Sequence, residues 1–240
     1  MSCECFLISA GYIALGLLAY KIGAALYNIL WPYLIASPVD LHSKAGAKWA
    51  VITGATDGIG KAYAYEMARK GFNVFIVSRT QSKLDEVQKD IIEKYSKVQV
   101  KTFAFDFCAG SMEAYSPLLK ALDEIEVGIL VNNVGMSYEY PEAIHTVEGG
   151  LQRVGNITVI NTLPTTVLCA SVIKQMLPRK KGIIINVSSS AGENPMAFWA
   201  VYCASKKYVT WLTQILRMEY GELGLTIQNN SSDDGGDEDE

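Results

Sequence analysis

The sequence predicts an α/β protein built on a doubly wound parallel sheet, which follows an N-terminal helix that anchors the chain in a membrane. Beyond residue 38, short β-branched runs alternate with longer helical stretches, and this alternation implies right-handed crossovers and a parallel sheet. Ahead of that pattern, residues 6–35 form an apolar run whose only charge is Lys21. These two observations divide the chain into an anchor and an α/β domain.

The composition of the chain argues for a single folded domain and against nucleic-acid binding and metal binding. The chain has 240 residues, of which 50% are hydrophobic, so it can bury one sizeable core. The last twelve residues hold six acids and no base, which leaves the rest of the chain close to neutral. Because no basic patch is present, a nucleic-acid partner is not expected. The five cysteines lack the paired spacing of a metal site, so we expect no metal.

Residues 1–36 are expected to form the membrane anchor, because the apolar run can cross a hydrocarbon layer of about 30 Å. A cleaved signal peptide is the first alternative, but Glu4 precedes the run and no basic segment leads it. A buried helix is the second, since Lys21 and Pro32 interrupt the run. Two lysines follow it, which places the rest of the chain on the cytosolic side. A single span and a bend at Pro32 both stay open.

A linker at 37–47 leads into a domain predicted at 48–228. Strands are expected at 48–53, 73–78, 98–105, 127–132 and 182–188, and helices at 61–70, 83–95, 112–122, 150–177 and 199–220. A sixth strand is expected to open at Leu225 and to stop at Gln228, because the residues from 229 to 240 are polar, small or acidic. We therefore expect an incomplete domain followed by a disordered tail. Ligands of such sheets bind at the carboxyl ends of the strands.

The first predicted strand runs into TGATDGIG, residues 53–60. Glycines at this place let the backbone approach a pyrophosphate at the start of the next helix. A plain tight turn is the alternative, but the position between a strand and a helix favours a dinucleotide site of the Rossmann type. Asp57 is expected to hold the turn together. The cofactor residues expected here and at later strand ends are Thr53, Gly54, Asp57, Gly58, Ile59, Gly60, Ser78, Arg79, Asp106, Asn133, Gly135, Tyr202 and Lys206.

Arg79 predicts the choice of cofactor. It follows the second strand, where proteins that prefer NAD carry an acid for the ribose hydroxyl. An arginine suits a 2′-phosphate instead, and so NADP(H). A solvated arginine is the alternative. Asp106, after the third strand, either faces the adenine edge or caps the next turn. After the fourth strand, the asparagines of NNVG can tie neighbouring loops, and Gly135 leaves room for the cofactor.

The chemistry is expected around YCASK, residues 202–206. Tyr202 and Lys206 are four residues apart on a predicted helix, so their side chains share a face. A tyrosine donates protons poorly near neutral pH unless a nearby cation favours its phenolate. Ser189 can hydrogen-bond a carbonyl oxygen that becomes negative during hydride transfer. Asn161, in the long helix before the fifth strand, can order a water near Lys206.

TGATDGIG, NNVG, Ser189 and YCASK resemble the short-chain dehydrogenase/reductase family over roughly residues 48–228. With the hydrophobic N-terminus, the stretch looks like the membrane-bound branch of the endoplasmic reticulum, which contains 17β-hydroxysteroid dehydrogenases and very-long-chain 3-oxoacyl-CoA reductases. The resemblance implies NADPH as the hydride donor and Tyr202 as the catalytic acid/base. It further implies that Ser189 orients the substrate carbonyl, that Lys206 lowers the tyrosine pKa and holds the ribose, and that Asn161 completes the proton relay.

We therefore expect NADPH-dependent reduction of a lipid ketone, either a 3-oxoacyl-CoA of fatty-acid elongation or a 17-ketosteroid. The domain is expected on the cytosolic side of the endoplasmic reticulum membrane, and a homodimer is allowed. Family members continue the last strand into a turn, a substrate-covering segment and a further strand, and we expect this chain to lack them. The alternative function is thus a catalytically silent, truncated paralogue that still binds the nucleotide.

Overall fold

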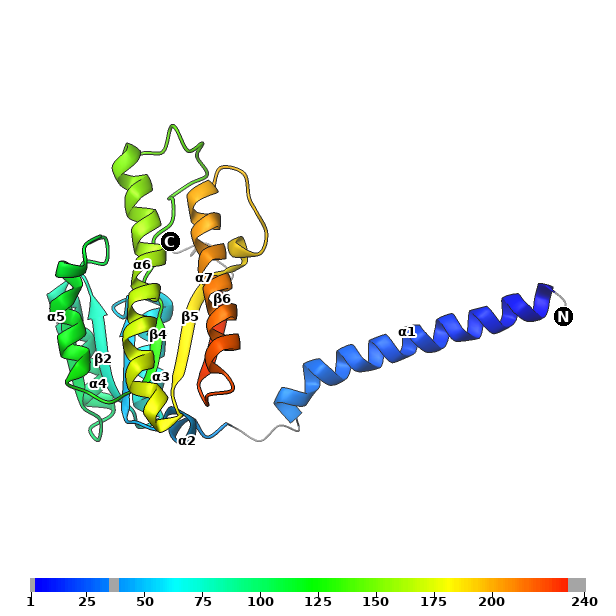
Figure 1. The fold of residues 1–240 in the computed structure, drawn as a ribbon, viewed down its shortest axis with the longest axis horizontal. Coiled ribbons are helices and arrows are strands. Elements are labelled where there is room, and N and C mark those ends of the chain that lie inside the picture. Colours follow the sequence, from blue (N-terminus) through cyan, green and yellow to red (C-terminus); the bar gives the residue numbers. More distant parts are fainter. Residues whose placement is uncertain (1–2, 35–38, 233–240) are drawn as a thin grey trace. The chain divides into compact units, whose positions relative to one another are not determined.

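The computed structural model describes residues 3–34 and 39–232. The chain divides after Asp40 into two compact units, the N-terminal helix and an α/β domain (Figure 1). The helices are α1 (Cys3–Leu34), α2 (Leu41–Ala45), α3 (Gly58–Arg69), α4 (Gln81–Lys94), α5 (Met112–Asp123), α6 (Gly150–Met176) and α7 (Ala200–Tyr220), with short 3-10 turns η1 (Leu177–Arg179) and η2 (Ser190–Gly192). The strands are β1 (Trp49–Thr53), β2 (Asn73–Ser78), β3 (Val100–Ala104), β4 (Val127–Asn132), β5 (Ile183–Ser189) and β6 (Thr226–Ser232).

Helix α1 has the length and composition of a membrane span. Its apolar part, Ile8–Trp31, covers 24 residues, and none of it is buried inside the structure. At about 1.5 Å per residue it is roughly 36 Å long, which exceeds the hydrocarbon thickness of a bilayer. Helix α6 also passes the test of length and hydropathy, but half of its apolar window is buried, as in the core helix of a globular domain. The end of the predicted anchor at residue 36 lies outside the described residues.

The domain is a six-stranded sheet in the order β3-β2-β1-β4-β5-β6, and every neighbouring pair is parallel. Successive side chains of a strand face opposite sides, which β1 illustrates: Ala50 and Ile52 pack into one core and Val51 into the other. The first core lies under α3 and α4, and the second lies under α5, α6 and α7. All six residues of β4 are buried, as a central strand of a two-faced sheet requires.

Local sequence signals set where the helices begin. The Asp57 carboxylate accepts a hydrogen bond from the Gly58 N–H, 2.8 Å away, and so caps α3. For this reason α3 begins at Gly58, three residues before the predicted start. The Ser111 hydroxyl likewise accepts from the Ala114 N–H, at 3.3 Å, and caps α5. The five predicted strands and five predicted helices are all present, with boundaries that differ by a few residues.

The prediction for the last strand was wrong. Strand β6 continues past Gln228 to Ser232, and its residues from Asn229 onward pair with the last four residues of β5. A parallel ladder is made by backbone groups, so polar side chains extend an edge strand as well as apolar ones do. The Asn230 side chain also donates to the Tyr63 hydroxyl of α3, at 2.9 Å. The predicted disordered tail at 229–240 therefore begins too early, and residues 233–240 lie outside the described part.

Candidate active site

The glycine turn after β1 has the backbone shape that its sequence predicted. Gly54 and Gly58 have φ angles of +63° and +47°, a region that favours glycine. A side-chain carbon on Gly60 would collide with the Gly54 carbonyl oxygen, so only glycine fits the close contact between helix and turn. Ile59 is 42% exposed beside it. The turn thus brings the start of α3 close to the end of β1, and the free N–H groups of a helix start attract anions.

The end of β4 is tied to the glycine turn. The buried Thr53 hydroxyl accepts hydrogen bonds from the N–H groups of Asn133 and Val134, each at 3.0 Å. The Asn133 side chain donates back to the carbonyls of Thr53 and Gly54, at 3.1 and 3.2 Å. The asparagine therefore ties neighbouring loops, as the NNVG sequence predicted, and Thr53 acts by holding these loops together.

A hollow of about 270 Å³ opens beyond this turn, over the ends of β2 and β3. Ser78, Arg79 and Asp106 line it, and the Ser78 hydroxyl lies 2.9 Å from that of Thr56 in the glycine turn. The Asp106 carboxylate accepts from the Cys108 N–H at 3.0 Å, so it caps the turn while also lining the hollow. The hollow lies at the carboxyl ends of the strands, where sheets of this kind bind their ligands.

A second hollow, of about 210 Å³, continues the first. Both are lined by Asn133, Gly135 and Met136, and the second also reaches Tyr202 and Lys206. A side-chain carbon on Gly135 would lie 3.4 Å from the Lys206 ammonium nitrogen. The two hollows form one groove over the carboxyl ends of the strands, at the point where the strand order reverses between β1 and β4.

Three of the predicted chemistry residues are almost fully buried, and two of them, Tyr202 and Lys206, line the inner end of this groove. The relative exposures are 1% for Ser189, 5% for Tyr202 and 6% for Lys206. The Lys206 ammonium lies 5.6 Å from the centre of the Tyr202 ring and donates to the Val187 carbonyl at 3.3 Å. The Ser189 hydroxyl accepts from the Ala191 N–H, at 3.1 Å. A phenol and a cation thus lie together, nearly buried, at the inner end of the groove, and Ser189 ends the strand β5 whose Val187 carbonyl holds that cation.

Asn161 lies beside these residues, on α6. Its side-chain oxygen accepts from the Met136 N–H at 2.8 Å, and its side-chain nitrogen donates to the Met136 carbonyl at 2.9 Å. The same nitrogen donates to the hydroxyl of Ser205, also at 2.9 Å, and that hydroxyl donates to the Tyr202 carbonyl at 2.7 Å. Asn161 therefore joins the groove wall to the helix that carries Tyr202. Its predicted role in ordering a water stays a prediction.

Sequence reasoning did not single out Ser205, Thr56 or Met136. Ser205 lies inside YCASK and Thr56 inside TGATDGIG, so both segments carried the signal of a site. Their roles depend on partners in other elements, however: Asn161 for Ser205 and Ser78 for Thr56. No spacing within one segment shows such a partner. Met136 follows NNVG directly, and it bonds the Asn161 side chain through its main-chain N–H and carbonyl, so its residue type gives no signal.

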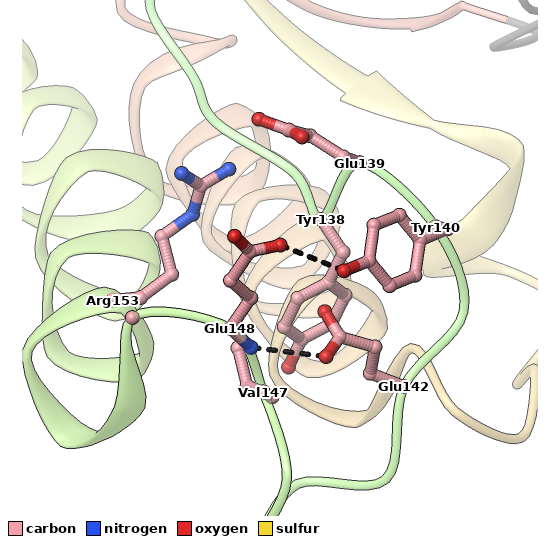
Figure 2. Close-up of a pocket in the computed structure, with 8 residues that line it drawn as sticks. Tyr138, Glu139, Tyr140, Glu142, Val147, Glu148 and Arg153 are labelled. Atoms are coloured by element: carbon pink, nitrogen blue, oxygen red, sulfur yellow. Dashed lines mark hydrogen bonds between the residues drawn. The ribbon is translucent and has the colours of Figure 1, made fainter.

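The loop between β4 and α6 forms a further hollow of about 270 Å³ (Figure 2). The Tyr140 hydroxyl donates to the Glu148 carboxylate at 2.7 Å, and this bond raises the pKa of Tyr140 to about 12. Tyr138 forms the inner wall, where its ring lies 5.7 Å from Trp199. Trp199 in turn packs edge-on against Tyr202, with ring centres 6.0 Å apart. The loop is thereby packed against the buried phenol.

Comparisons with known proteins agree with this geometry. The family model described as short chain dehydrogenase matches residues 48–231. A very-long-chain 3-oxoacyl-CoA reductase of Caenorhabditis elegans is 60% identical over 228 residues, which are 95% of this chain and 72% of that protein. A very-long-chain 3-oxoacyl-CoA reductase of Mus musculus is 36% identical over 227 residues, 93% of this chain and 70% of that protein.

Solved structures point to the same fold. A short-chain dehydrogenase from Sphingobium yanoikuyae in complex with NADPH superposes with a TM-score of 0.68 at 28% identity, over 75% of this chain and 68% of that one. The parallel sheet, the glycine turn and the buried Tyr202–Lys206 pair are thus found in a chain whose sequence matches one family model over residues 48–231. The chain belongs to the short-chain dehydrogenase/reductase family of oxidoreductases.

Proposed function

We propose that this protein is an NADPH-dependent reductase of a lipid ketone. The observation that carries the proposal is the burial of Tyr202 and Lys206 at the inner end of a groove whose outer end is lined by Arg79, with the buried Ser189 at the end of the adjoining strand β5. A dinucleotide needs such a groove, and a ketone needs a proton donor beside the place where the hydride arrives. Both requirements meet over the carboxyl ends of the strands.

The residues present fit the cofactor. The glycine turn, in which Gly60 has no space for a side chain, would hold the pyrophosphate at the start of α3. Arg79 would pair with the 2′-phosphate, and Lys206 would hold the ribose of the nicotinamide end. NADPH, when bound, supplies the hydride. The complex of the Sphingobium relative with NADPH supports this choice of cofactor.

The chain's own residues manage the proton and the carbonyl. Ser189 would donate a hydrogen bond to the substrate carbonyl oxygen, and Tyr202 would transfer its phenolic proton to that oxygen as negative charge develops there. The Lys206 ammonium, close to the phenol ring, stabilises the phenolate that remains. Asn161 would complete the path by which the phenolate regains a proton. Burial strengthens each of these electrostatic contacts, because little water screens them.

The substrate class is proposed as a long-chain 3-oxoacyl-CoA rather than a 17-ketosteroid. The names of the relatives from nematode and mouse support it. So does a hollow of about 330 Å³ between η2 and the first turns of α7, which Pro195, Met196 and Cys203 line with apolar atoms. This hollow lies against α7, the helix that also carries Tyr202. A steroid remains the second candidate, to be decided by the same assay.

We further propose that α1 anchors the protein in the endoplasmic reticulum membrane, with the α/β domain in the cytosol. The unburied 24-residue apolar stretch supports the anchor. Two lysines close behind α1, Lys44 and Lys48, support the cytosolic side. An anchor suits a substrate whose acyl chain partitions into the bilayer, since enzyme and substrate then share one surface.

The test is NADPH oxidation by the purified, detergent-solubilised protein with a 3-oxoacyl-CoA of long chain and, in parallel, with a 17-ketosteroid. The Tyr202→Phe variant is the control for background oxidation. We expect turnover of the acyl-CoA that the control lacks. NADPH binding without turnover of either substrate would instead support the catalytically silent alternative, and turnover of the steroid alone would reassign the substrate.

A further inference from the structure

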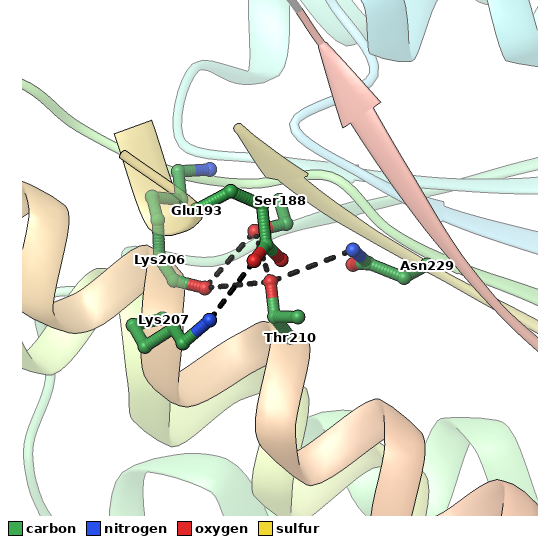
Figure 3. A network of polar contacts seen from close by, with 6 residues as sticks. All are labelled: Ser188, Glu193, Lys206, Lys207, Thr210 and Asn229. Atoms are coloured by element: carbon green, nitrogen blue, oxygen red, sulfur yellow. Dashed lines mark hydrogen bonds and ion pairs between the residues drawn. The ribbon is translucent and has the colours of Figure 1, made fainter. Parts of the chain in front are cut away.

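A buried hydroxyl pair holds the main chain of Lys206. The Ser188 hydroxyl donates to the Lys206 carbonyl at 2.9 Å, and the Thr210 hydroxyl, one helical turn on, reaches the same carbonyl at 3.3 Å (Figure 3). The two hydroxyls are 2.9 Å apart. Ser188 and Thr210 have relative exposures of 0% and 1%, so water does not compete for these bonds.

The contact lies where three elements meet. Gly192, in η2, is packed so closely that a side-chain carbon there would lie 3.0 Å from the Lys206 carbonyl oxygen. On β5, Val187 accepts from the Lys206 ammonium and Ser188 donates to the Lys206 carbonyl. Two consecutive residues of β5 therefore hold both the side chain and the main chain of one lysine. The next residue along β5 is Ser189.

The chain of hydroxyls continues to β6. The Asn229 side-chain nitrogen donates to the Thr210 hydroxyl oxygen at 3.4 Å (Figure 3). The single Thr210 proton can go either to the Lys206 carbonyl or to the Ser188 hydroxyl, and in the second arrangement the donors run in one direction, from Asn229 to Thr210, from Thr210 to Ser188, and from Ser188 to the Lys206 carbonyl. Bonds aligned in this way reinforce one another in a low-dielectric interior. The outer strand of the sheet is thus linked to the lysine of the site.

We propose that Ser188 and Thr210 are positioning residues, which set Lys206 and Ser189 at the correct places relative to Tyr202. The inference rests on the proposed reductase function. Fixing Ser188 to α7 fixes where the end of β5 places Ser189. It also fixes the helix turn that carries Tyr202 and Lys206. Since a displacement of about 1 Å can cost on the order of a hundredfold in rate, loss of this pair reduces turnover without removing any group that touches the substrate.

Thr213 offers a matched control on the same helix. It is 0% exposed, its hydroxyl donates to the Val209 carbonyl at 2.7 Å, and it accepts from the Asn186 side chain of β5 at 2.9 Å. Like Thr210, it is buried, its hydroxyl lies within hydrogen-bond distance of the carbonyl one turn back, and it contacts a side chain of β5. It differs in the carbonyl that it contacts, which is not that of Lys206.

The experiment compares Thr210→Val with Thr210→Ser and Thr213→Val in the full-length protein. Thr210→Val should lower kcat about tenfold, leave the Kd for NADPH within about twofold, and move the pH profile of kcat upward, because the cation then favours the phenolate less. Thr210→Ser restores the hydroxyl and should recover the wild-type profile. Thr213→Val should lower the Tm comparably while the pH profile stays in place. Equal effects of Thr210→Val and Thr213→Val on kcat and pH profile would show that the pair is merely structural.

A second measurement separates this inference from the proposed function. The titration of Tyr202 is read as the phenolate absorbance that the Tyr202→Phe variant lacks, and it needs no substrate. Thr210→Val should move this titration to higher pH, and Thr213→Val should not. A wild-type protein without reductase activity would refute the proposed function, whereas an unmoved titration in Thr210→Val would refute the positioning role.

Discussion

The ammonium of Lys206 donates a hydrogen bond to the Val187 carbonyl at 3.3 Å, and this bond fixes a positive charge beside the buried ring of Tyr202. The lysine belongs to α7 and the carbonyl to the end of β5. The charge is therefore held by the junction of a helix and a strand, and not by the helix alone. A cation placed in this way favours ionisation of a neighbouring phenol.

Replacing Tyr202 by Phe should therefore abolish proton transfer while keeping the ring and its packing. We expect kcat to fall about a hundredfold or more, with the Kd for NADPH nearly unchanged. Stopped-flow turnover and cofactor fluorescence measure the two quantities. The control for a lost hydroxyl is Tyr138→Phe. Tyr138 is also buried, and its ring packs against Trp199, with ring centres 5.7 Å apart. Turnover retained in Tyr202→Phe would assign the acid to another residue.

Arg79→Asp should reverse the cofactor preference. Arg79 is exposed and lines the hollow over the ends of β2 and β3. The substitution replaces its guanidinium by a carboxylate, which repels a 2′-phosphate and can bind a ribose hydroxyl. We expect NADPH affinity to fall about tenfold or more, with a smaller loss for NADH. The same substitution at Arg69, at the far end of α3, controls for net charge. If both cofactors lose affinity equally, Arg79 does not read the phosphate.

Cys108 offers a probe of the cofactor site that requires no activity. It lines the hollow over the ends of β2 and β3 and is partly exposed. Burial, together with the neighbouring Asp106, raises the pKa of its thiol. Because the thiolate reacts and the thiol does not, alkylation should become rapid only at a higher pH than for a free cysteine. Saturating NADPH should slow it.

Peptide mass spectrometry can follow this reaction site by site. Cys169 serves as an internal control, since it is 1% exposed and its burial raises the pKa of its thiol to about 12. It should remain unmodified until the protein unfolds. Modification of Cys108 at the same rate with and without NADPH would show that the adenosine does not occupy this hollow.

The sequence predicted the residues that line the groove better than it predicted the hydrogen bonds between the segments that form the groove. Gly60, Arg79 and the pair Tyr202 and Lys206 lie where their segments indicated, because a strand end or a helical spacing fixes such positions locally. Those positions follow from the backbone of a single segment. The Rossmann-type sheet was predictable for the same reason, since strand and helix patterns repeat along the chain.

Contacts between distant segments were not predictable in this way. Ser205 bonds Asn161 across 44 positions, and Asn229 bonds Thr210 across the α7–β6 connection. Such pairs depend on the final distance between packed elements, which no local pattern contains. The polar residues after Gln228 were misjudged for a related reason. Their low hydrophobicity argued against a core, whereas an edge strand needs only its backbone to pair.

Helix α1 should hold the protein in membranes after carbonate extraction, because its 24-residue apolar stretch is not buried against the rest of the described protein and is long enough to span the bilayer. Protease added outside sealed microsomes should digest the α/β domain. Lysines in place of Leu17 and Leu18 form the control, since each central charge costs roughly 3 kcal/mol on insertion. That variant should appear in the supernatant. A domain protected from protease in sealed vesicles would reverse the proposed orientation.

The residues after Gln228 should matter for stability and for turnover. They pair with the four residues of β5 that end at Ser189, and Asn229 adds a bond to Thr210. A chain shortened to end at Gln228 should lose about 2 kcal/mol of unfolding free energy, because several ladder bonds of roughly 0.5–1.5 kcal/mol each disappear while some chain entropy is regained. Its turnover should also fall, since the end of β5 that carries Ser189 becomes a sheet edge.

A chain shortened to end at Ser232 is the matched comparison, because it keeps the full β5–β6 ladder and the Asn230 bond to Tyr63. Urea unfolding should place it within error of the intact protein. The residues beyond Ser232 are rich in acids, and we expect their removal to change solubility more than stability. Equal unfolding free energies for the two shortened chains would mean that the last four residues of β6 pair without stabilising the sheet. Turnover is a separate measurement on the same two chains. The chain that ends at Gln228 lacks the bond from Asn229 to Thr210, so we expect it to turn over more slowly than the chain that ends at Ser232.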